Sequence, residues 1–492
     1  MAGKINTNFP NQNFTLLFVL GLVAFCIFFL YRNQYSYGDA LIYADNILKL
    51  RFGDISIHWG YYCLGLIFHL ILGSMGLTID NSLVIMSNVF GAVCVSYSYL
   101  FFRKFQFDKK SSIIGSLMLL FAGVFFSYSI QAEVYIPQLA FLLASMYYYM
   151  SSKPAVSGIL FGIALLITPL SIFTLPFYIF IFIKERLSIK NAFYFILPSI
   201  IIYLPVFAFV HEDLLWGRRG LLSISAGMGM NTFQIIIVNT IFAFGKSFHV
   251  LLPFALFGLI YSAMKNRFIF ALFSIILAGN LFLFVKLNRD DLTTAMLPVF
   301  VFLIILAILG LNRINLSISS WIGNKNIFRY AVLAMYILIN AFIWIGPSRL
   351  PHPRILNDRS YQEALINFAN RTTDDVLFIA SFWHGVAYSF YTRSDIEEEL
   401  ETTMGNNRWL DIEDLDKDKW AVIKRNYEEI YIQEAYSPSS AAKLLLSDSE
   451  LKTRYEQNSI KARIAILDGE MGFIEFAKTD DIWIYKAKFP GY

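Results

Sequence analysis

The chain has 492 residues, of which 57% are hydrophobic and only 15% are charged. Soluble domains carry about 25% charged residues, so this composition excludes an ordinary soluble enzyme and indicates a membrane protein with many spans. The net charge of +4 is small and fits basic loops on one side of a membrane better than a surface for nucleic acid. The three cysteines lie in or beside apolar segments without the spacing of a metal site.

Apolar runs long enough to cross a bilayer recur along residues 1–346. The first run follows a polar N-terminus and has no small-residue cleavage site after it, so we expect a retained signal anchor. About eleven spans are predicted in total, at residues 14–31, 82–102, 112–128, 134–151, 156–170, 171–184, 192–210, 244–264, 268–286, 292–311 and 327–346. Residues 1–346 are therefore predicted to form a polytopic α-helical membrane domain.

Residues 61–77 are also apolar, but a span here would place the basic residues 103–110 opposite every later basic loop. If the segment lies along the interface instead, all basic loops fall on one side, as the positive-inside rule requires. His69, in the middle of the segment, also suits a partly hydrated helix. We therefore expect an interfacial or re-entrant helix, with residues 32–81 and 129–133 on the non-cytoplasmic side.

The tail, residues 347–492, is rich in charge and begins with a proline-rich linker. Strands are predicted at 376–380, 429–432, 472–476 and 482–485, the last two forming a hairpin, and a helix is predicted at 384–391. A small α/β domain of this size can bury a core of its own. The count of spans places it outside the cytoplasm.

An acidic stretch, Tyr-Gly-Asp-Ala-Leu-Ile-Tyr-Ala-Asp at 37–45, follows the first span. Partial desolvation at the water–lipid boundary raises the pKa of a carboxylate there, toward the range in which it works well as a general base. Asp39 is therefore a candidate catalytic base, with Tyr37 and Tyr43 beside it. The alternative is that Asp39 is only the N-cap of a short helix.

A second carboxylate, Glu133, lies in a very short turn between two predicted spans and is therefore held close to the bilayer. Such a residue suits a second acid that faces Asp39 across a cleft. The alternative is a carboxylate that only complements the N-terminus of the following helix.

Cations and aromatic residues also gather in the predicted outer loops. Arg218 and Arg219 lie between two glycines and could offer guanidinium groups to a phosphate, or pair with nearby acids at the rim. Lys286 and Arg289 form a similar group before the span at 292–311. His58, within His-Trp-Gly-Tyr-Tyr at 58–62, either anchors the chain at the interface or lines a sugar or lipid headgroup site.

These features together resemble the GT-C superfamily of membrane glycosyltransferases, within it the bacterial protein O-mannosyltransferase-like and aminoarabinose-transferase-like members. Tyr-Gly-Asp at 37–39 stands where the family has its catalytic aspartate, and Ala-Glu-Val-Tyr at 132–135 resembles a family signature. His-Trp-Gly-Tyr at 58–61 resembles a His-Pro-Pro-Gly-Tyr stretch, with Trp59 in place of the prolines. Thr-Pro-Leu-Ser at 168–171 departs from the His-rich turn of many members.

The resemblance implies an inverting glycosyltransferase that moves a sugar from a polyprenyl-phosphate donor to an acceptor hydroxyl of a glycan, lipid or protein. In this reading Asp39 is the general base, the four cations bind the donor phosphate, and Glu133 binds substrate. The further substrate-binding candidates are Tyr37, Tyr43, His58, Tyr61 and Tyr135. The resemblance implies no particular cofactor and leaves metal use open, with Asp39 and Glu133 as ligands of a divalent ion if one binds. The expected location is a bacterial inner membrane, with the active site and tail on the periplasmic or extracellular side.

Two alternatives come from other classes of protein. A transporter or flippase of lipid-linked saccharides would also need outer cations, although it would more often carry charges inside its spans and show paired halves. A non-catalytic membrane assembly protein would leave Asp39 and Glu133 free to change.

Overall fold

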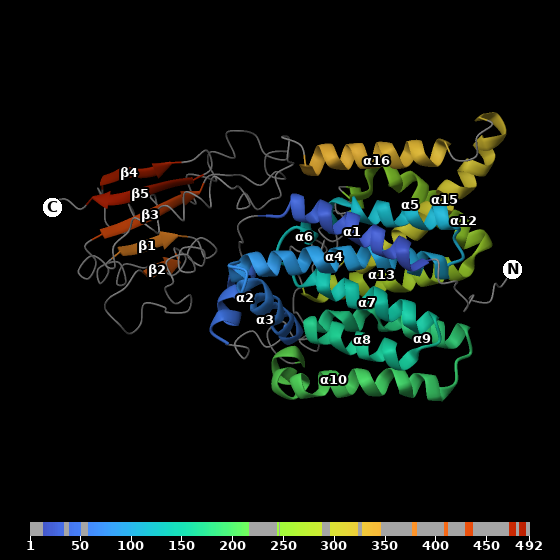
Figure 1. The fold of residues 1–492 in the computed structure, drawn as a ribbon, viewed down its shortest axis with the longest axis horizontal. Coiled ribbons are helices and arrows are strands. Elements are labelled where there is room, and N and C mark those ends of the chain that lie inside the picture. The colour runs from blue at the N-terminus through green and yellow to red at the C-terminus, as the bar shows by residue number, and fades with distance from the viewer. Residues whose placement is uncertain are drawn as a thin grey trace. The chain divides into compact units, whose positions relative to one another are not determined.

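A computed structural model describes the helical part of the chain and five strands of its tail (Figure 1). The described residues are 13–33, 39–50, 58–215, 244–245, 247–287, 296–322, 327–345, 376–380, 408–411, 429–435, 472–478 and 482–488. The chain divides into two compact units, each described by itself. The helical unit comprises Met1–Arg32 and Arg51–Ser348, and the sheet unit comprises Asn33–Leu50 and Arg349–Tyr492.

The helical unit is built from long apolar helices joined by short turns. Its helices are α1 (Asn13–Leu30), α3 (Trp59–Gly73), α4 (Ile79–Lys104), α5 (Lys109–Leu120), α6 (Gly123–Ser129), α7 (Tyr135–Met150), α8 (Pro154–Ile167), α9 (Leu175–Lys184), α10 (Ile189–Leu215), α12 (Leu252–Lys265), α13 (Arg267–Leu287), α15 (Leu297–Ile322) and α16 (Ile327–Ile345). Two short 3-10 helices, η1 (Pro169–Thr174) and η2 (His249–Leu251), precede α9 and α12. Proline in the first turn of α8, α9 and α12 suits these starts, because the first helical N–H groups have no partner within the helix.

Helix α4 is the central helix in the first half of this unit. It packs against α1, α3, α5, α6 and α7. Helix α7 then packs on α8, and α8 on α10, so that these helices lie side by side in Figure 1. Helix α15 packs against α5, α12 and α13. The helix interfaces bury large aromatic side chains such as Phe28, Phe101 and Phe125.

Helices α12 and α15 approach each other at backbone contact. A Cβ atom on Gly258 would collide with the carbonyl oxygen of Leu306, and one on Gly310 would collide with the carbonyl oxygen of Phe254. Small residues at such crossings allow close packing of helices in a membrane, where lipid tails remove the hydrophobic drive between helices.

Within the described residues, three helices are long and apolar enough to cross a membrane, namely α4, residues 189–207 of α10 and residues 297–317 of α15. Helices α5 and α6 together make a fourth candidate, bent by 65°. The predicted span 112–128 is therefore broken, and Ser247 Oγ accepts a hydrogen bond (3.2 Å) from Val124 N just after the break. A partner of this kind is what broken helices need at membrane depth.

The other predicted spans correspond to shorter apolar helices, except 134–151, whose helix α7 has 16 residues, so the full set of eleven stays a prediction. The predicted span 171–184 is divided into η1 and α9, and the predicted span 292–311 continues as α15 to Ile322. The segment expected at the interface forms α3, which is apolar and shorter than a span. A polytopic helical membrane protein is thus the class of fold observed.

The sheet unit contains α2 (Asp39–Leu48) and a five-stranded mixed sheet in the order β2-β1-β3-β5-β4. Its strands are β1 (Val376–Ala380), β2 (Arg408–Asp411), β3 (Glu429–Ala435), β4 (Gly472–Lys478) and β5 (Ile482–Lys488). Strand β1 is parallel to β2 and β3, and β5 is antiparallel to β3 and β4. The four predicted strands and the final hairpin are confirmed, whereas β2 was not predicted. The predicted helix 384–391 lies outside the described residues, so the α/β class and the domain boundary after residue 346 stay predictions.

Candidate active site

The turn between α6 and α7 carries Glu133 and is attached to α4. The backbone N–H of Glu133 donates to Oγ of Ser87 (3.3 Å), and Nδ2 of Asn88 donates to the carbonyl oxygen of Ser129 (2.6 Å). Gln131 Nε2 lies 3.4 Å from Glu133 Oε1 and donates to it. The half-buried Glu133 lies just before the N-terminus of α7, whose partial positive charge favours a carboxylate.

His58 joins the start of α3 to the end of α8. Its Nδ1 lies 2.8 Å from the carbonyl oxygen of Ile167, the last residue of α8. Because a carbonyl only accepts, this contact assigns the Nδ1 proton and, in the neutral ring, leaves Nε2 as an acceptor. The backbone of α3 at Gly60 lies against the backbone of Leu166 and Ile167. The first turn of α3 is therefore seated on α8.

Tyr61, in this first turn of α3, is influenced by the charge of Glu133. Its side chain is fully buried, and burial is the main cause that raises the pKa of its phenol well above the usual value. The negative charge of Glu133 raises the Tyr61 pKa further, which also means that the two groups lie near each other. The phenol therefore stays neutral beside the carboxylate. Tyr62, also fully buried, adds a smaller contribution.

Four predicted site residues thus belong to one region of the helical unit, namely His58, Tyr61, Glu133 and Tyr135. Tyr135 begins α7 directly after the Glu133 turn, and its ring centroid lies 6.5 Å from that of Tyr128. An imidazole, a phenol and a carboxylate together can bind the hydroxyl groups of a sugar or an acceptor.

The remaining predicted site residues are not placed relative to these four. Asp39 is the exposed first residue of α2 and Tyr43 is buried in the same helix, both within the sheet unit. Lys286 lies near the end of α13, where only the backbone is described. The other four residues, Tyr37, Arg218, Arg219 and Arg289, lie outside the described residues.

Ser87 and Asn88 were missed as candidates because they lie inside a predicted span. Both side chains are fully buried. Two adjacent polar residues within an apolar run are a signal that could have identified them, since such side chains hydrogen-bond to neighbouring helices in a membrane.

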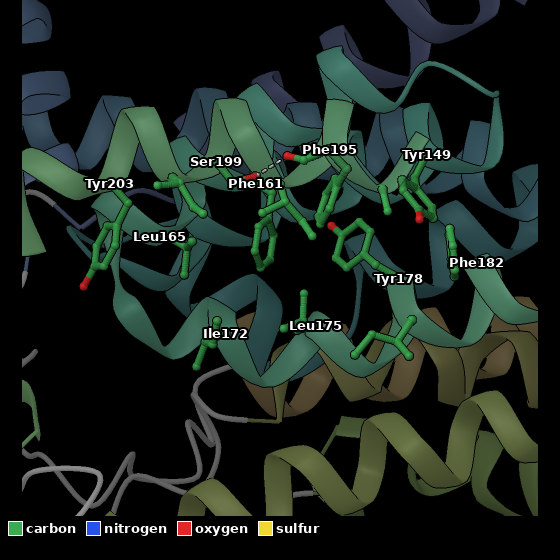
Figure 2. A pocket seen from close by; sticks show the side chains of 14 residues that line it. Tyr149, Phe161, Leu165, Ile172, Leu175, Tyr178, Phe182, Phe195, Ser199 and Tyr203 are labelled. Carbon is green, nitrogen blue, oxygen red and sulfur yellow. Dashed lines mark hydrogen bonds between the residues drawn. The ribbon is translucent and has the colours of Figure 1, made fainter. Parts of the chain in front are cut away.

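An apolar cavity of about 430 Å³ lies between α8, α9 and α10 (Figure 2). Its wall includes Leu165, Ile172, Tyr178 and Ile196. Ser199 also lines it, but its hydroxyl is already bonded to the carbonyl oxygens of residues 158 and 195 (2.9 and 2.8 Å). The cavity has the size of a small-molecule site and a surface suited to a hydrocarbon chain. One end adjoins the α8–η1 turn, where His58 is bonded.

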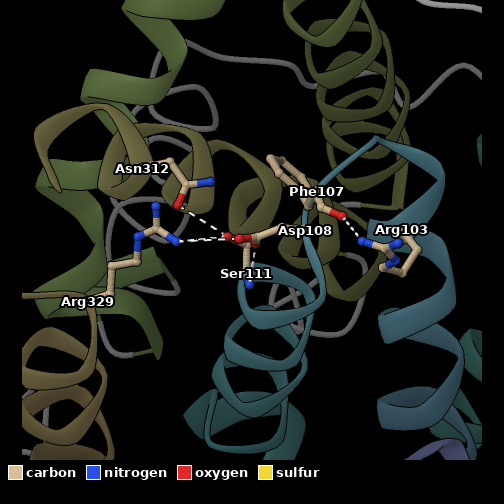
Figure 3. Close-up of polar contacts among 6 residues, drawn as sticks. All are labelled: Arg103, Phe107, Asp108, Ser111, Asn312 and Arg329. Atoms are coloured by element: carbon tan, nitrogen blue, oxygen red, sulfur yellow. Dashed lines mark hydrogen bonds and ion pairs between the residues drawn. The ribbon is translucent and has the colours of Figure 1, made fainter. Parts of the chain in front are cut away.

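The opposite ends of the helices carry a polar cluster that joins α5, α15 and α16 (Figure 3). Asp108 caps α5 by accepting from Ser111 N (2.8 Å), and its carboxylate lies 4.0 Å from Arg329 Nη1. Ser111 Oγ donates to Asn312 Oδ1 (3.3 Å). Partial burial raises the pKa of Asp108, but the bonds from Ser111 and the charges of Arg329 and Arg103 outweigh it and hold the pKa below its usual value. This cluster fastens α16 and lies outside the candidate site.

The sequence leaves open whether the site binds a divalent metal ion. Across the described residues there is no group of three or more His, Cys, Asp or Glu side chains placed to hold a metal ion. The described part of the site therefore does not by itself fit a metal ion.

The arrangement of helices is similar to that in solved structures of ArnT and of an archaeal oligosaccharyltransferase, so the expected fold is confirmed. The crystal structure of ArnT from Cupriavidus metallidurans bound to undecaprenyl phosphate is similar with a TM-score of 0.59 and 11% identity, over 96% of this chain and 97% of ArnT.

Two structures of the oligosaccharyltransferase from Archaeoglobus fulgidus are also similar. The complex of AglB with an inhibitory peptide and a dolichol-phosphate has a TM-score of 0.56 and 12% identity, over 96% of this chain and 74% of AglB. The complex with Zn and sulfate has a TM-score of 0.53 and 13% identity, over 96% and 72%. At these identities the likeness concerns the fold alone. The sequence matches no family model and none of the curated proteins compared with it.

Proposed function

We propose that this protein is an inverting glycosyltransferase, which transfers a sugar from a polyprenyl-phosphate donor to an acceptor hydroxyl outside the cytoplasm. The observation that carries the proposal is the similarity of fold over nearly the whole length of ArnT, which was crystallised with undecaprenyl phosphate. The AglB complex with a dolichol-phosphate supports the same class of donor.

In the proposed reaction the acceptor oxygen attacks the anomeric carbon of the donor sugar as the bond from that carbon to the phosphate oxygen breaks. The polyprenyl phosphate leaves with the bonding electron pair, and the configuration at the anomeric carbon is inverted. Asp39 accepts the acceptor proton. It is the first and exposed residue of α2, so its carboxylate is accessible to a hydroxyl group.

The leaving phosphate carries negative charge that cations must stabilise. Arg218, Arg219, Lys286 and Arg289 are the proposed binding residues, because preorganised cations act most strongly where charge develops during the reaction.

Glu133 and its neighbours are the proposed sugar-binding side of the site. The carboxylate accepts from a substrate hydroxyl, and the neutral Tyr61 phenol and the Nε2 atom of His58 are further hydrogen-bonding groups.

The cavity between α8, α9 and α10 is the proposed place for part of the donor hydrocarbon chain. Its apolar wall and its position next to the α8–η1 turn support this assignment, since a lipid tail there would end near His58. We place the protein in a bacterial inner membrane, with the site and the tail domain, residues 347–492, on the periplasmic or extracellular side.

The test is transfer by the purified full-length protein, supplied with a polyprenyl-phosphate sugar pool and candidate glycan, lipid and protein acceptors. We expect release of polyprenyl phosphate that depends on an acceptor. Asp39→Asn is expected to lower kcat by about 10²-fold to 10⁴-fold, the usual contribution of a general base. Undiminished transfer by this variant would remove Asp39 as the base.

Matched controls separate chemistry from charge. Asp45→Asn removes a carboxylate from the same helix, one that pairs with Lys49 at 2.9 Å, and should leave the rate within about threefold. Glu133→Gln should lower kcat/KM by about 10²-fold, whereas Glu185→Gln, which loses only a contact with Lys184 at 3.4 Å, should not. Absence of transfer by the wild-type protein with every donor and acceptor would refute the proposed function.

A further inference from the structure

We infer that Ser87 and Asn88 of α4 are positioning residues, which hold the Glu133 turn in place for the reaction. This inference rests on the proposed function, in which Glu133 binds substrate. Neither residue is expected to touch the reacting atoms. Each acts through the backbone of the turn.

The two side chains fix both ends of the turn. Asn88 Nδ2 donates to the carbonyl oxygen of Ser129, the last residue of α6, at 2.6 Å. Four residues further along the chain, the N–H of Glu133 donates to Ser87 Oγ at 3.3 Å. Because the two anchors are adjacent on one rigid helix, the backbone between Ser129 and Glu133 has a fixed start and a fixed end.

The backbone of α4 lies close to the same turn one helical turn later, at Gly91. A Cβ atom there would lie 2.7 Å from Ser129 Oγ and 2.9 Å from Cε2 of Phe28. Ser129 is therefore confined by contact as well as by the bond from Asn88, and its own hydroxyl donates back to the Phe125 carbonyl oxygen at 2.8 Å.

Three other buried polar residues of the helical unit bond differently. Asn280 and Asn340 each donate to a carbonyl oxygen one turn back in their own helix, at 2.8 and 3.0 Å. Ser98 Oγ, also on α4, lies 2.7 Å from Val95 O of its own helix and 3.1 Å from Ser116 Oγ, and its one proton is shared between these two acceptors. Among these five residues, only Ser87 and Asn88 bond to the turn that carries a candidate site carboxylate. Their hydrogen bonds therefore hold that turn in place, whereas those of the other three only satisfy a buried polar group.

The inference predicts that Ser87→Ala lowers kcat/KM by about tenfold to hundredfold, because a displacement of the order of 1 Å at a binding group costs up to about 10²-fold. Ser87→Thr keeps a hydroxyl and should restore much of the rate. Asn88→Ala should act in the same direction. Ser98→Ala and Asn340→Ala are the matched controls and should leave the rate within about threefold.

A double-mutant cycle with Glu133→Gln supplies a readout that a merely structural role would not move. If Ser87 acts through Glu133, Ser87→Ala should cause no further loss in the Glu133→Gln background. Full loss in that background, equal to the loss in the wild-type background, would overturn the inference. So would wild-type rates for both Ser87→Ala and Asn88→Ala while Glu133→Gln is impaired, an outcome that leaves the proposed function intact.

Hydrogen–deuterium exchange of residues 129–135 tests the same anchors without any activity. The Glu133 amide should exchange about fivefold to tenfold faster in Ser87→Ala, because its hydrogen bond is lost. Exchange unchanged from that of Ser98→Ala would overturn the inference even if no sugar transfer were detected. If Glu133→Gln is fully active while exchange accelerates, the anchors exist and it is the role of Glu133 in the proposed function that fails.

Discussion

Replacing Gly60 with alanine tests whether the first turn of α3 is seated on α8. A Cβ atom on Gly60 would lie 2.8 Å from both the backbone N of Ile167 and the carbonyl C of Leu166, and 2.9 Å from Leu166 Cβ. Backbone atoms cannot rotate away, so the start of α3 must move. Ordinary van der Waals contact begins near 3.4 Å, which requires a shift of about 0.6 Å.

This shift has two costs. Overpacking of a tight contact destabilises a protein by about 1–3 kcal/mol. The bond between His58 Nδ1 and the Ile167 carbonyl oxygen, now 2.8 Å, would lengthen beyond good geometry and lose about 1 kcal/mol. The better helix propensity of alanine returns about 1 kcal/mol, so we expect a net loss of about 1–3 kcal/mol. Because Tyr61 moves with the helix, transfer should also fall by about tenfold or more.

The assay is thermal unfolding in detergent together with the transfer rate, and Gly73→Ala at the other end of α3 is the control. A Cβ atom at Gly73 would meet only the ring of His69 at 3.1 Å, and that side chain can turn aside. Gly60→Ala should melt about 2–6 °C below Gly73→Ala. Equal melting temperatures and equal rates in the two variants would refute the seating of α3 on α8.

Three further predictions concern other parts of the helical unit. Gly258→Ala should lower the free energy of unfolding by about 1–3 kcal/mol, because its Cβ meets a carbonyl oxygen of α15. The control is Gly245→Ala, which should not lower it, because no described atom lies within 4 Å of a Cβ there. Equal effects of the two substitutions in chemical unfolding would contradict the close contact between the helices. Ile196→Trp should raise KM for the lipid donor, because it narrows the cavity between α8, α9 and α10. The control is Leu197→Trp, which lies outside the cavity wall and should leave KM unchanged. Equal KM values for the two variants would show that the donor does not bind in the cavity. The lowered pKa of Asp108 means that its carboxylate stabilises the fold above the usual pKa of about 4 and that this contribution is lost as the pH falls through the lower folded value. Asp108→Asn should therefore reduce the loss of unfolding free energy at acid pH by less than about 1 kcal/mol, since the side chain is 59% exposed. If the unfolding free energies of the variant and the wild type fall in parallel as the pH is lowered, the predicted contribution of Asp108 is refuted.

The positions of helices and strands could be predicted where one local property dominates. Long apolar runs marked α1, α4 and α7, and β-branched and aromatic runs marked β1, β3 and β5. The break between α5 and α6 could not be predicted, because no proline marks it and its freed N–H group is satisfied by Ser247, more than a hundred residues away. Strand β2 is short, and pairing with β1 defines it more than its own composition does.

The residues of the candidate site also differ in whether the sequence alone could indicate them. Glu133 was a candidate because its turn is too short to move, and His58 and Tyr61 were candidates because their stretch could line a headgroup site. The sequence did not predict that these three residues belong to one region. Ser87 and Asn88 could not be predicted, since their role depends on which backbone groups face them across a helix interface. Sequence patterns reveal the chemistry that a residue offers, whereas the partner that orients it is a property of packing.

The parts of the site in the helical unit are held by the backbones of neighbouring helices. His58 is bonded to the end of α8, and the Glu133 turn is bonded to the middle of α4. Since α3 packs on both α4 and α8, a change in the packing of these three helices moves the imidazole, the phenol and the carboxylate together. A substitution that separates α3 from α8 should therefore affect binding of every acceptor alike. Substitutions that alter acceptor choice are expected instead in groups that these helices do not hold.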